Sequence, residues 1–367
     1  MRTSASPQLK AKNKIKIGSS KHSLLFKIMI LIFSEQRDYS TTKVMEYLLL
    51  WGKPVTRINY EDFNRLQLDI QMNADGQVTF NIDFGGNLIR LESLQSVWFR
   101  RGEIPIRFVK TSDFKGQSAA VTRQVNSYLL EEQKTINSFF YDCLIGANVR
   151  VLGNPGIYNA KKLSTLFKAS KLGLRIPESY ISNNASLIKE RVLYSEDSTY
   201  ITKGIQDNIS VSTNTHLFHT RTILLNKSNM TQAPDQVELS LVQRKLEKEY
   251  EIRSFYLDGR FFSVAIFSQQ NEKTKIDFRN YDFDNPNRKI PVKLPNTIEN
   301  KLKKLLKEMG LNTASIDLVF TTKGEYVFLE VNPVGQFDMV GKIINNHIDK
   351  EIALWLSKRK RAHSKAF

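Results

Sequence analysis

The stretch of sequence that decides the fold lies near the C-terminus, where residues 316–333 read IDLVFTTKGEYVFLEVNP. Two runs of β-forming residues flank Lys323-Gly324, which we take as the loop of a tight hairpin. With these two residues as the loop, Asp317 on the first strand pairs with Glu330 on the second. The pattern therefore predicts a hairpin in which two carboxylates lie directly opposite each other, about 5 Å apart.

The opposed carboxylates need a positive group between them, because like charges in direct opposition destabilise a sheet. Asn332 lies two residues after Glu330 and therefore on the same face of the strand. Two carboxylates and an amide oxygen suit Mg²⁺, an ion that also binds substrate phosphates. The alternative is a solvent-facing sheet edge, where acidic residues are common. The apolar residues 327–329 supply both faces of the strand and disfavour that alternative.

Two lysines are predicted to face inward. In a helix expected over residues 158–172, Lys162 falls on the apolar face and Lys161 on the polar face. Lys203 shares one face of an expected strand with two isoleucines. An ammonium in such a place needs an anionic partner, although a lysine can also extend its amine to water from an apolar setting. Together with a magnesium-type carboxylate pair, both lysines indicate a nucleoside triphosphate.

The charge of the chain is concentrated at its two ends. The 367 residues hold 54 Lys and Arg against 37 Asp and Glu, a net charge of +17. Residues 1–28 carry seven basic side chains and residues 358–367 carry five, with no acid in either segment, so we expect a disordered basic extension and a basic tail. Residues 29–357 hold 42 basic and 37 acidic side chains, a net charge of +5. This distribution disfavours a nucleic-acid-binding protein, in which the charge spreads along one face of the body.

The cysteine content and the hydropathy limit the class of protein further. A single cysteine, Cys143, excludes a disulfide framework and fits a reducing compartment. No apolar run approaches the ~20 residues of a membrane span. We therefore expect a cytoplasmic protein with no membrane partner.

The N-terminal part of the body has the pattern of an α/β domain over residues 29–155. The apolar run 28–33 predicts a buried strand, and a helix-spaced set of apolar residues and a second strand at 55–58 follow it. Two alternating stretches around Asp75-Gly76 predict a hairpin. A long helix is expected around residues 121–140.

With these elements in place, the sequence resembles the ATP-grasp superfamily, and within it the microviridin-type (graspetide) peptide maturases, closest to the grasp-with-spasm group. The resemblance is carried by short motifs: MILIFS (29–34) with DYST (38–41), VWFRR (97–101), Lys162 ahead of GLRIP (173–177), Lys203, Gln243 followed by EIR (251–253), DFR (277–279) and LEVNPVGQ (329–336). It implies an α/β (α+β) ATP-grasp fold behind an N-terminal pre-ATP-grasp domain at 29–155. The two ATP-grasp subdomains would cover 156–240, which bears the lysines, and 241–357, which bears the magnesium site.

The resemblance also implies roles for individual residues. Lys162 and Lys203 would contact the phosphates of ATP, and Asp317, Glu330 and Asn332 would hold Mg²⁺. The nucleotide-binding set would be completed by an adenine hinge and one acid: Gln243, Arg244, Lys245, Leu246 and Glu251. The catalytic set would be Arg253, Arg279 and Asp277, with the arginines neutralising charge around the γ-phosphate and the acyl phosphate. Residues 206–214, where many ATP-grasp enzymes have a glycine-rich loop, are instead rich in Ser and Asn.

The activity implied by the resemblance is ATP-dependent crosslinking of a ribosomally made precursor peptide. ATP would phosphorylate an Asp or Glu side chain, and a Lys amine or a Ser or Thr hydroxyl of the same peptide would displace the phosphate. The partner would be the leader and core of that peptide, with residues 183–199 as a candidate leader surface, and a homodimer is left open. The same motifs also fit an ATP-grasp ligase that adds free amino acids to a protein or peptide. A basic nucleic-acid-binding protein is the second alternative.

Overall fold

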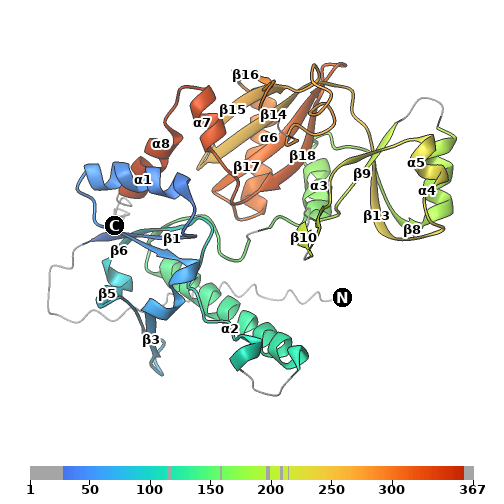
Figure 1. Ribbon diagram of the computed structural model, residues 1–367. Coiled ribbons are helices and arrows are strands. Elements are labelled where there is room, and N and C mark those ends of the chain that lie inside the picture. Colours follow the sequence, from blue (N-terminus) through green and yellow to red (C-terminus); the bar gives the residue numbers. More distant parts are fainter. Residues whose placement is uncertain are drawn as a thin grey trace, which may run out of the picture. The chain divides into compact units, whose positions relative to one another are not determined.

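The computed structural model describes residues 28–113, 118–157, 159–195, 199–206, 210–213, 215–280 and 282–358. The expectation of a disordered basic extension and of a basic tail falls almost wholly outside these residues. The chain forms two compact units (Figure 1): unit 1 consists of Met1–Gly156 and Lys350–Phe367, and unit 2 consists of Ile157–Asp349. Within the described residues, no helix combines the length and the apolar character that crossing a membrane would require.

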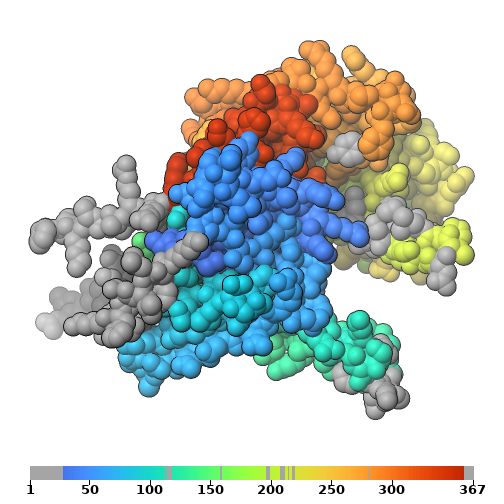
Figure 2. Space-filling view, turned by 60° about the vertical axis from the view of Figure 1, so that its left-hand side comes forward, coloured from blue at the N-terminus to red at the C-terminus, as the bar shows by residue number. Residues whose placement is uncertain are grey.

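Unit 1 is built on a parallel sheet of strand order β2-β1-β6-β7. Its strands are β1 (Met29–Ser34), β2 (Val55–Asn59), β6 (Leu94–Phe99) and β7 (Arg150–Leu152), and its helices are α1 (Tyr39–Leu50) and α2 (Ala119–Gly146). The predicted βαβ unit is confirmed, with β1 and β2 parallel and joined by α1. Phe33 stacks on Phe99 with ring centroids 5.2 Å apart, and Phe140 of α2 closes the same core. The first turns of α2 project away from this sheet (Figure 2).

A second, antiparallel sheet of order β3-β4-β5 completes the N-terminal part of unit 1. It contains β3 (Leu66–Met72), β4 (Val78–Phe84) and β5 (Asn87–Arg90). Unit 1 also contains the short 3-10 helices η1 (Tyr60–Arg65), η2 (Leu91–Ser93) and η3 (Thr111–Asp113). The predicted hairpin around Asp75-Gly76 is confirmed, and Gly76 takes a φ of 79°, which favours glycine.

The end of the chain returns to unit 1 through α8 (Ile348–Ser357). The side chains of Gln95 and Ser96 on β6 both donate hydrogen bonds to the carbonyl of Leu356, at 3.0 and 2.8 Å. Residues 350–357 therefore group with the N-terminal unit, whereas the sequence motifs had placed them with the C-terminal subdomain.

Unit 2 contains two larger antiparallel sheets and a small hairpin of β10 (Ser210–Ser212) and β11 (Leu217–His219). The first large sheet has the order β12-β9-β13-β8, with β8 (Ser179–Asn184), β9 (Tyr200–Lys203), β12 (Ile223–Leu225) and β13 (Gln236–Arg244). Helices α4 (Ala185–Leu193) and α5 (Lys227–Thr231) accompany it. Tyr200, Val242 and Met230 belong to the apolar core of this subdomain.

The second sheet has the order β16-β15-β14-β17-β18. Its strands are β14 (Lys248–Leu257), β15 (Arg260–Phe267), β16 (Arg288–Pro291), β17 (Thr313–Thr321) and β18 (Tyr326–Asn332). Helices α3 (Lys162–Lys171) and α6 (Asn296–Glu308) share one core with this sheet, and α7 (Asp338–Ile343) follows β18. Helix α3 begins at Lys162 and is therefore shorter than the predicted helix over 158–172.

The hairpin of β17 and β18 confirms the predicted pairing of Asp317 with Glu330, but its loop and its register differ from the predicted ones. The predicted two-residue loop is wrong: Thr321 N–H donates to the carbonyl of Glu325, so three residues form the loop. This longer loop shifts the register by one residue, and a β-bulge at Leu329 shifts it back. Strand β18 is the last strand of its sheet, and its outer side is partly covered because Phe328 N–H donates to the carbonyl of Arg175 at 2.8 Å.

Candidate active site

A pocket of about 770 Å³ lies between the two large sheets of unit 2. Its walls come from β9 and β13 of one sheet, from β14, β17 and β18 of the other, and from the loop at 275–279. Leu329 and Glu330 both line the pocket although they are adjacent on one strand, and the bulge at Leu329 makes this possible because it interrupts the alternation of faces.

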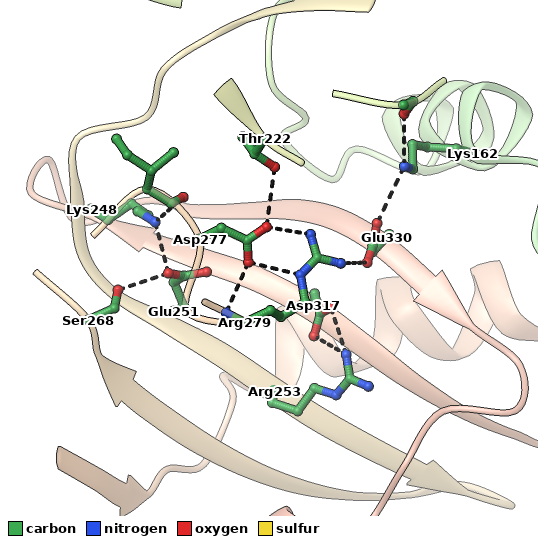
Figure 3. Close-up of polar contacts among 12 residues, drawn as sticks. Lys162, Thr222, Lys248, Glu251, Arg253, Ser268, Asp277, Arg279, Asp317 and Glu330 are labelled. Carbon is green, nitrogen blue, oxygen red and sulfur yellow. Dashed lines mark hydrogen bonds and ion pairs between the residues drawn. The ribbon is translucent and has the colours of Figure 1, made fainter. Parts of the chain in front are cut away.

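The two opposed carboxylates are each paired with a cation (Figure 3). Arg253 lies opposite Asp317 in the β14–β17 register, and its Nη1 lies 2.7 Å from both carboxylate oxygens. Glu330 accepts from Nη1 of Arg279 at 3.4 Å and lies 3.8 Å from Nζ of Lys162. Burial raises the pKa of the Asp317 carboxyl, and the Arg253 guanidinium opposes this shift. The positive groups that the opposed pair requires are thus supplied from three separate elements.

Arg279 is itself held by Asp277, two residues before it (Figure 3). Its Nε and Nη2 donate to the two oxygens of Asp277 at 2.9 and 2.7 Å, and Thr222 Oγ1 donates to the same carboxylate at 3.2 Å. Burial raises the pKa of Asp277, but the hydrogen bonds and the charge of Arg279 outweigh it and leave that pKa below its usual value. Asp277 therefore stays ionised and fixes the guanidinium.

Lys162 and Lys203 both point into the region beside Glu330. Lys162 Nζ donates to the carbonyl of Gly204 at 3.2 Å, and its side chain is 12% exposed, as the apolar face predicted. Burial lowers the pKa of Lys203 to about 8; the carboxylate of Glu330 opposes this shift, and the charge of Lys162 adds to it. Among the described residues the Lys203 ammonium makes no hydrogen bond or ion pair, so it can accept an anionic ligand.

The expected adenine hinge, Gln243–Leu246, runs from the end of β13 into the pocket wall. Two of its backbone donors are already used: Arg244 N–H donates to the carbonyl of Glu178 at 2.9 Å, and Lys245 N–H donates to that of Thr199 at 2.8 Å. Within the described part of the chain, the N–H of Leu246 makes no hydrogen bond. Leu246 is therefore the residue of this segment whose N–H can donate to a ligand.

Glu251 takes part in a buried network that the sequence did not reveal (Figure 3). Its Oε1 accepts from Lys248 Nζ and from Ser268 Oγ, both at 2.8 Å, and Lys248 also donates to the carbonyl of Ile276 at 3.1 Å. Burial raises the pKa of Glu251, while the charge of Lys248 lowers it. Lys248 and Glu251 are three residues apart and would face opposite sides of a regular strand, but a register shift near residue 249 brings them together. Lys248 thereby anchors the loop that carries Asp277 and Arg279.

Asn332 extends the row of oxygen groups on β18, since Asp317 pairs with Glu330 and Ser315 pairs with Asn332 on the same face. Its Oδ1 accepts from Val334 N–H at 3.1 Å. In the part of the chain that the structure describes, no three His, Cys, Asp or Glu side chains are placed to hold a metal ion.

Two predicted surfaces are only partly described. Residues 207–209 and 214 of the expected phosphate-covering segment lie outside the described residues. Of the candidate leader surface, residues 183–195 include α4, and residues 196–198 are not described.

Comparison with known proteins assigns the fold. No family model matches the chain, and no curated protein matches it. Among solved structures, it is similar to a RiPP-associated ATP-grasp ligase of Chryseobacterium gregarium in complex with ADP and a leader and core peptide, at 23% identity over 90% of this chain and 98% of that chain, with a TM-score of 0.72. It is also similar to macrocyclase MdnC of Microcystis aeruginosa bound with precursor peptide MdnA, at 25% identity over 89% of this chain and 99% of that chain, with a TM-score of 0.69.

A third similar structure is the ATP-grasp ligase PsnB with a phosphomimetic variant of a minimal precursor, Mg and ADP. The identity is 17% over 89% of this chain and 97% of that chain, with a TM-score of 0.63. The chain therefore has the fold of ATP-grasp ligases, and the α/β fold class expected from the sequence is confirmed. The resemblance to peptide maturases is confirmed as well, because these matches are to ATP-grasp ligases and a macrocyclase in complex with leader, core or precursor peptides.

Proposed function

We propose that this protein is an ATP-grasp ligase that crosslinks a ribosomally made precursor peptide, joining Asp or Glu side chains to Lys, Ser or Thr side chains as macrocyclic ω-amides or ω-esters. The observation that carries this proposal is the pocket of unit 2, where the opposed carboxylates Asp317 and Glu330 lie among Lys162, Arg253 and Arg279. Such a site suits a ligand with a chain of phosphates, because it combines cations with carboxylates that can hold a divalent metal.

In the first step, a carboxylate oxygen of the peptide attacks the γ-phosphorus of ATP, and ADP leaves. Lys162 and Lys203 bind the phosphate oxygens, and Leu246 N–H donates to the adenine. Arg253 and Arg279 stabilise the negative charge at the transferring phosphoryl group, and Asp277 keeps Arg279 in place. Positioning and charge stabilisation supply most of the catalysis of phosphoryl transfer, and no covalent enzyme intermediate is needed.

The residues at the carboxylate row fit a magnesium ion. Two carboxylates and one amide oxygen lie on one sheet face, and Mg²⁺ is commonly bound by one or two carboxylates together with substrate phosphates and water. Asp317, Glu330 and Asn332 would hold it. When bound, the ion neutralises charge on the phosphates and draws electron density from them.

In the second step, the nitrogen of a Lys side chain or the oxygen of a Ser or Thr side chain attacks the acyl carbon. The carbon–oxygen bond to the phosphate breaks, inorganic phosphate leaves, and the attacking group loses its proton. Each crosslink therefore removes one water from the mass of the peptide and consumes one ATP.

Mass spectrometry tests the proposal. The purified protein is incubated with ATP, Mg²⁺, a mixture of free amino acids and a short peptide encoded beside its gene that carries Thr, Ser or Lys and Asp or Glu near its end. We expect the peptide to lose one water per crosslink. A gain in mass would favour the ligase that adds free amino acids, and RNA binding without ATP hydrolysis would favour the nucleic-acid-binding protein.

We also propose that the leader of the precursor binds at α4, within the candidate surface 183–199. The buried face of α4 is used by the subdomain core, whereas Leu187 is 48% exposed and Tyr194 just beyond the helix is 79% exposed. Alanine at these two positions should raise the KM for the full precursor and leave the KM for ATP unchanged. An equal effect on a leaderless core peptide would contradict this placement.

We also propose that the enzyme acts in the cytoplasm, on a peptide rather than on nucleic acid or a membrane. A homodimer is consistent with this function. Light scattering of the purified protein at working concentration measures its oligomeric state.

A further inference from the structure

The turn that follows β18 is pressed against β17 at one point. A Cβ built on Gly335 would lie 2.2 Å from Cβ and 2.4 Å from Oγ of Ser315. Ser315 is 1% exposed, and its Oγ donates to the carbonyl of Gln336 at 3.1 Å, so it has no room to move aside. The φ of Gly335 lies outside the left-handed region, so this contact, and not the backbone conformation, is what requires glycine here.

The same turn sets the orientation of Asn332. Asn332 is the pairing partner of Ser315 across the hairpin. Its carbonyl accepts from Gly335 N–H at 3.1 Å, and its Oδ1 accepts from Val334 N–H at 3.1 Å. Phe337, 1% exposed, buries the end of the turn in the core. The backbone and the side chain of Asn332 are therefore both held by a turn whose distance from the sheet depends on the contact of Gly335 with Ser315.

We infer that Ser315 and Gly335 are positioning residues for Asn332, and that their close contact keeps its amide oxygen in line with the carboxylates of Asp317 and Glu330. The inference rests on the proposed function, in which these three side chains hold Mg²⁺ beside the nucleotide. Residues that orient metal ligands affect metal affinity strongly although they do not touch the metal.

A side chain at position 335 would have to lift the turn away from β17. The two hydrogen bonds from the turn to Asn332 would then lengthen, and the amide oxygen would leave the carboxylate row. Asp317 and Glu330 would stay in place, because Arg253, Arg279 and Lys162 hold them independently of the turn. The expected defect is therefore confined to metal binding.

The experiment compares Gly335→Ala, Ser315→Gly and the double variant in the full chain. Binding of Mn²⁺, as a probe of the magnesium site, is measured by electron paramagnetic resonance in the presence of ADP. Binding of ADP without metal is measured in parallel. Gly156→Ala serves as a matched control, because a Cβ there would approach only Oδ1 of Asn154, at 3.3 Å.

We expect Gly335→Ala to weaken Mn²⁺ binding by about tenfold to a hundredfold, with little change in ADP binding. Ser315→Gly removes the two atoms that the new methyl group would approach most closely and leaves the carbonyl oxygen of Asn332, at 3.1 Å, as the nearest atom, so the double variant should recover most of the Mn²⁺ affinity of Ser315→Gly alone. If Gly335→Ala does not fold, the double variant and Ser315→Gly still decide the question. Wild-type affinity in Gly335→Ala, or no recovery in the double variant, would overturn the inference. A wild-type protein that binds neither ADP nor Mn²⁺ would instead refute the proposed function.

Discussion

Replacement of Lys203 by methionine should make the protein more stable at neutral pH and, at the same time, weaken its nucleotide binding. Burial lowers the pKa of Lys203 from 10.5 to about 8, so the folded protein holds this proton less tightly than the unfolded chain does. At about 1.4 kcal/mol per pKa unit, the charged lysine costs the folded state ~3 kcal/mol at pH 7. Methionine has a similar length, carries no charge and avoids that cost.

The sign of the pH dependence follows from the same shift. Below pH 8 the lysine is charged in both states, and the full cost is present. Between pH 8 and 10.5 the folded state releases the proton while the unfolded chain keeps it, so the cost falls as the pH rises. The stability advantage of Lys203→Met over the wild type should therefore be largest at pH 7 and should shrink towards pH 10.

Urea unfolding of both proteins at several pH values between 7 and 10 measures the difference in their free energies of unfolding. Groups that titrate alike in both proteins contribute equally to both values and drop out of this difference. Lys161→Met is the matched control, because Lys161 lies on the exposed side of the start of α3 and should show no comparable trend. A variant less stable than the wild type at pH 7, or a difference that does not change with pH, would refute the reasoning.

Three further outcomes are expected. Glu330→Gln should abolish ATP turnover while leaving the fold intact by circular dichroism, since it removes one of the two carboxylates at the metal site; retained peptide crosslinking would rule out that role. Lys248→Met should cost the folded state about 3–5 kcal/mol, because it leaves Glu251 buried and unpaired, and Lys248→Met/Glu251→Gln should recover part of the loss in urea unfolding. Binding of ADP at pH 8.5 should take up protons, because a phosphate next to Lys203 raises its pKa; calorimetry in two buffers of different ionisation enthalpy measures the uptake, and Lys203→Met should abolish it.

The sequence was most informative where the signals are local. The hairpin of β17 and β18, the hairpin at Asp75-Gly76 and the inward side of Lys162 all follow from alternation, from turn residues or from helical spacing. Each of these patterns involves residues close in sequence, so the backbone geometry of one element determines which side chains share a face.

The pairings between distant segments could not be predicted in this way. Arg253 and Asp317 meet because β14 and β17 are neighbours in one register, and nothing local in either strand indicates that register. Lys248 was not predicted as a site residue, because an irregularity in its strand places its side chain on the face opposite to the one that regular alternation predicts. The return of α8 to unit 1 depends on contacts with β6, some 260 residues earlier in the chain.

The loop and the bulge of the β17–β18 hairpin make the carboxylate pair tolerant of a one-residue change in chain length. Removal of the extra residue at Leu329 would leave the register that starts at the loop uninterrupted, so Asp317 would still lie opposite Glu330. Removal of one residue from the loop at 322–324 would be absorbed at the bulge, because Leu329 would then lie opposite Leu318 and Asp317 would again lie opposite Glu330. In a search for homologous enzymes, a one-residue gap at either place is therefore compatible with an intact pair of carboxylates.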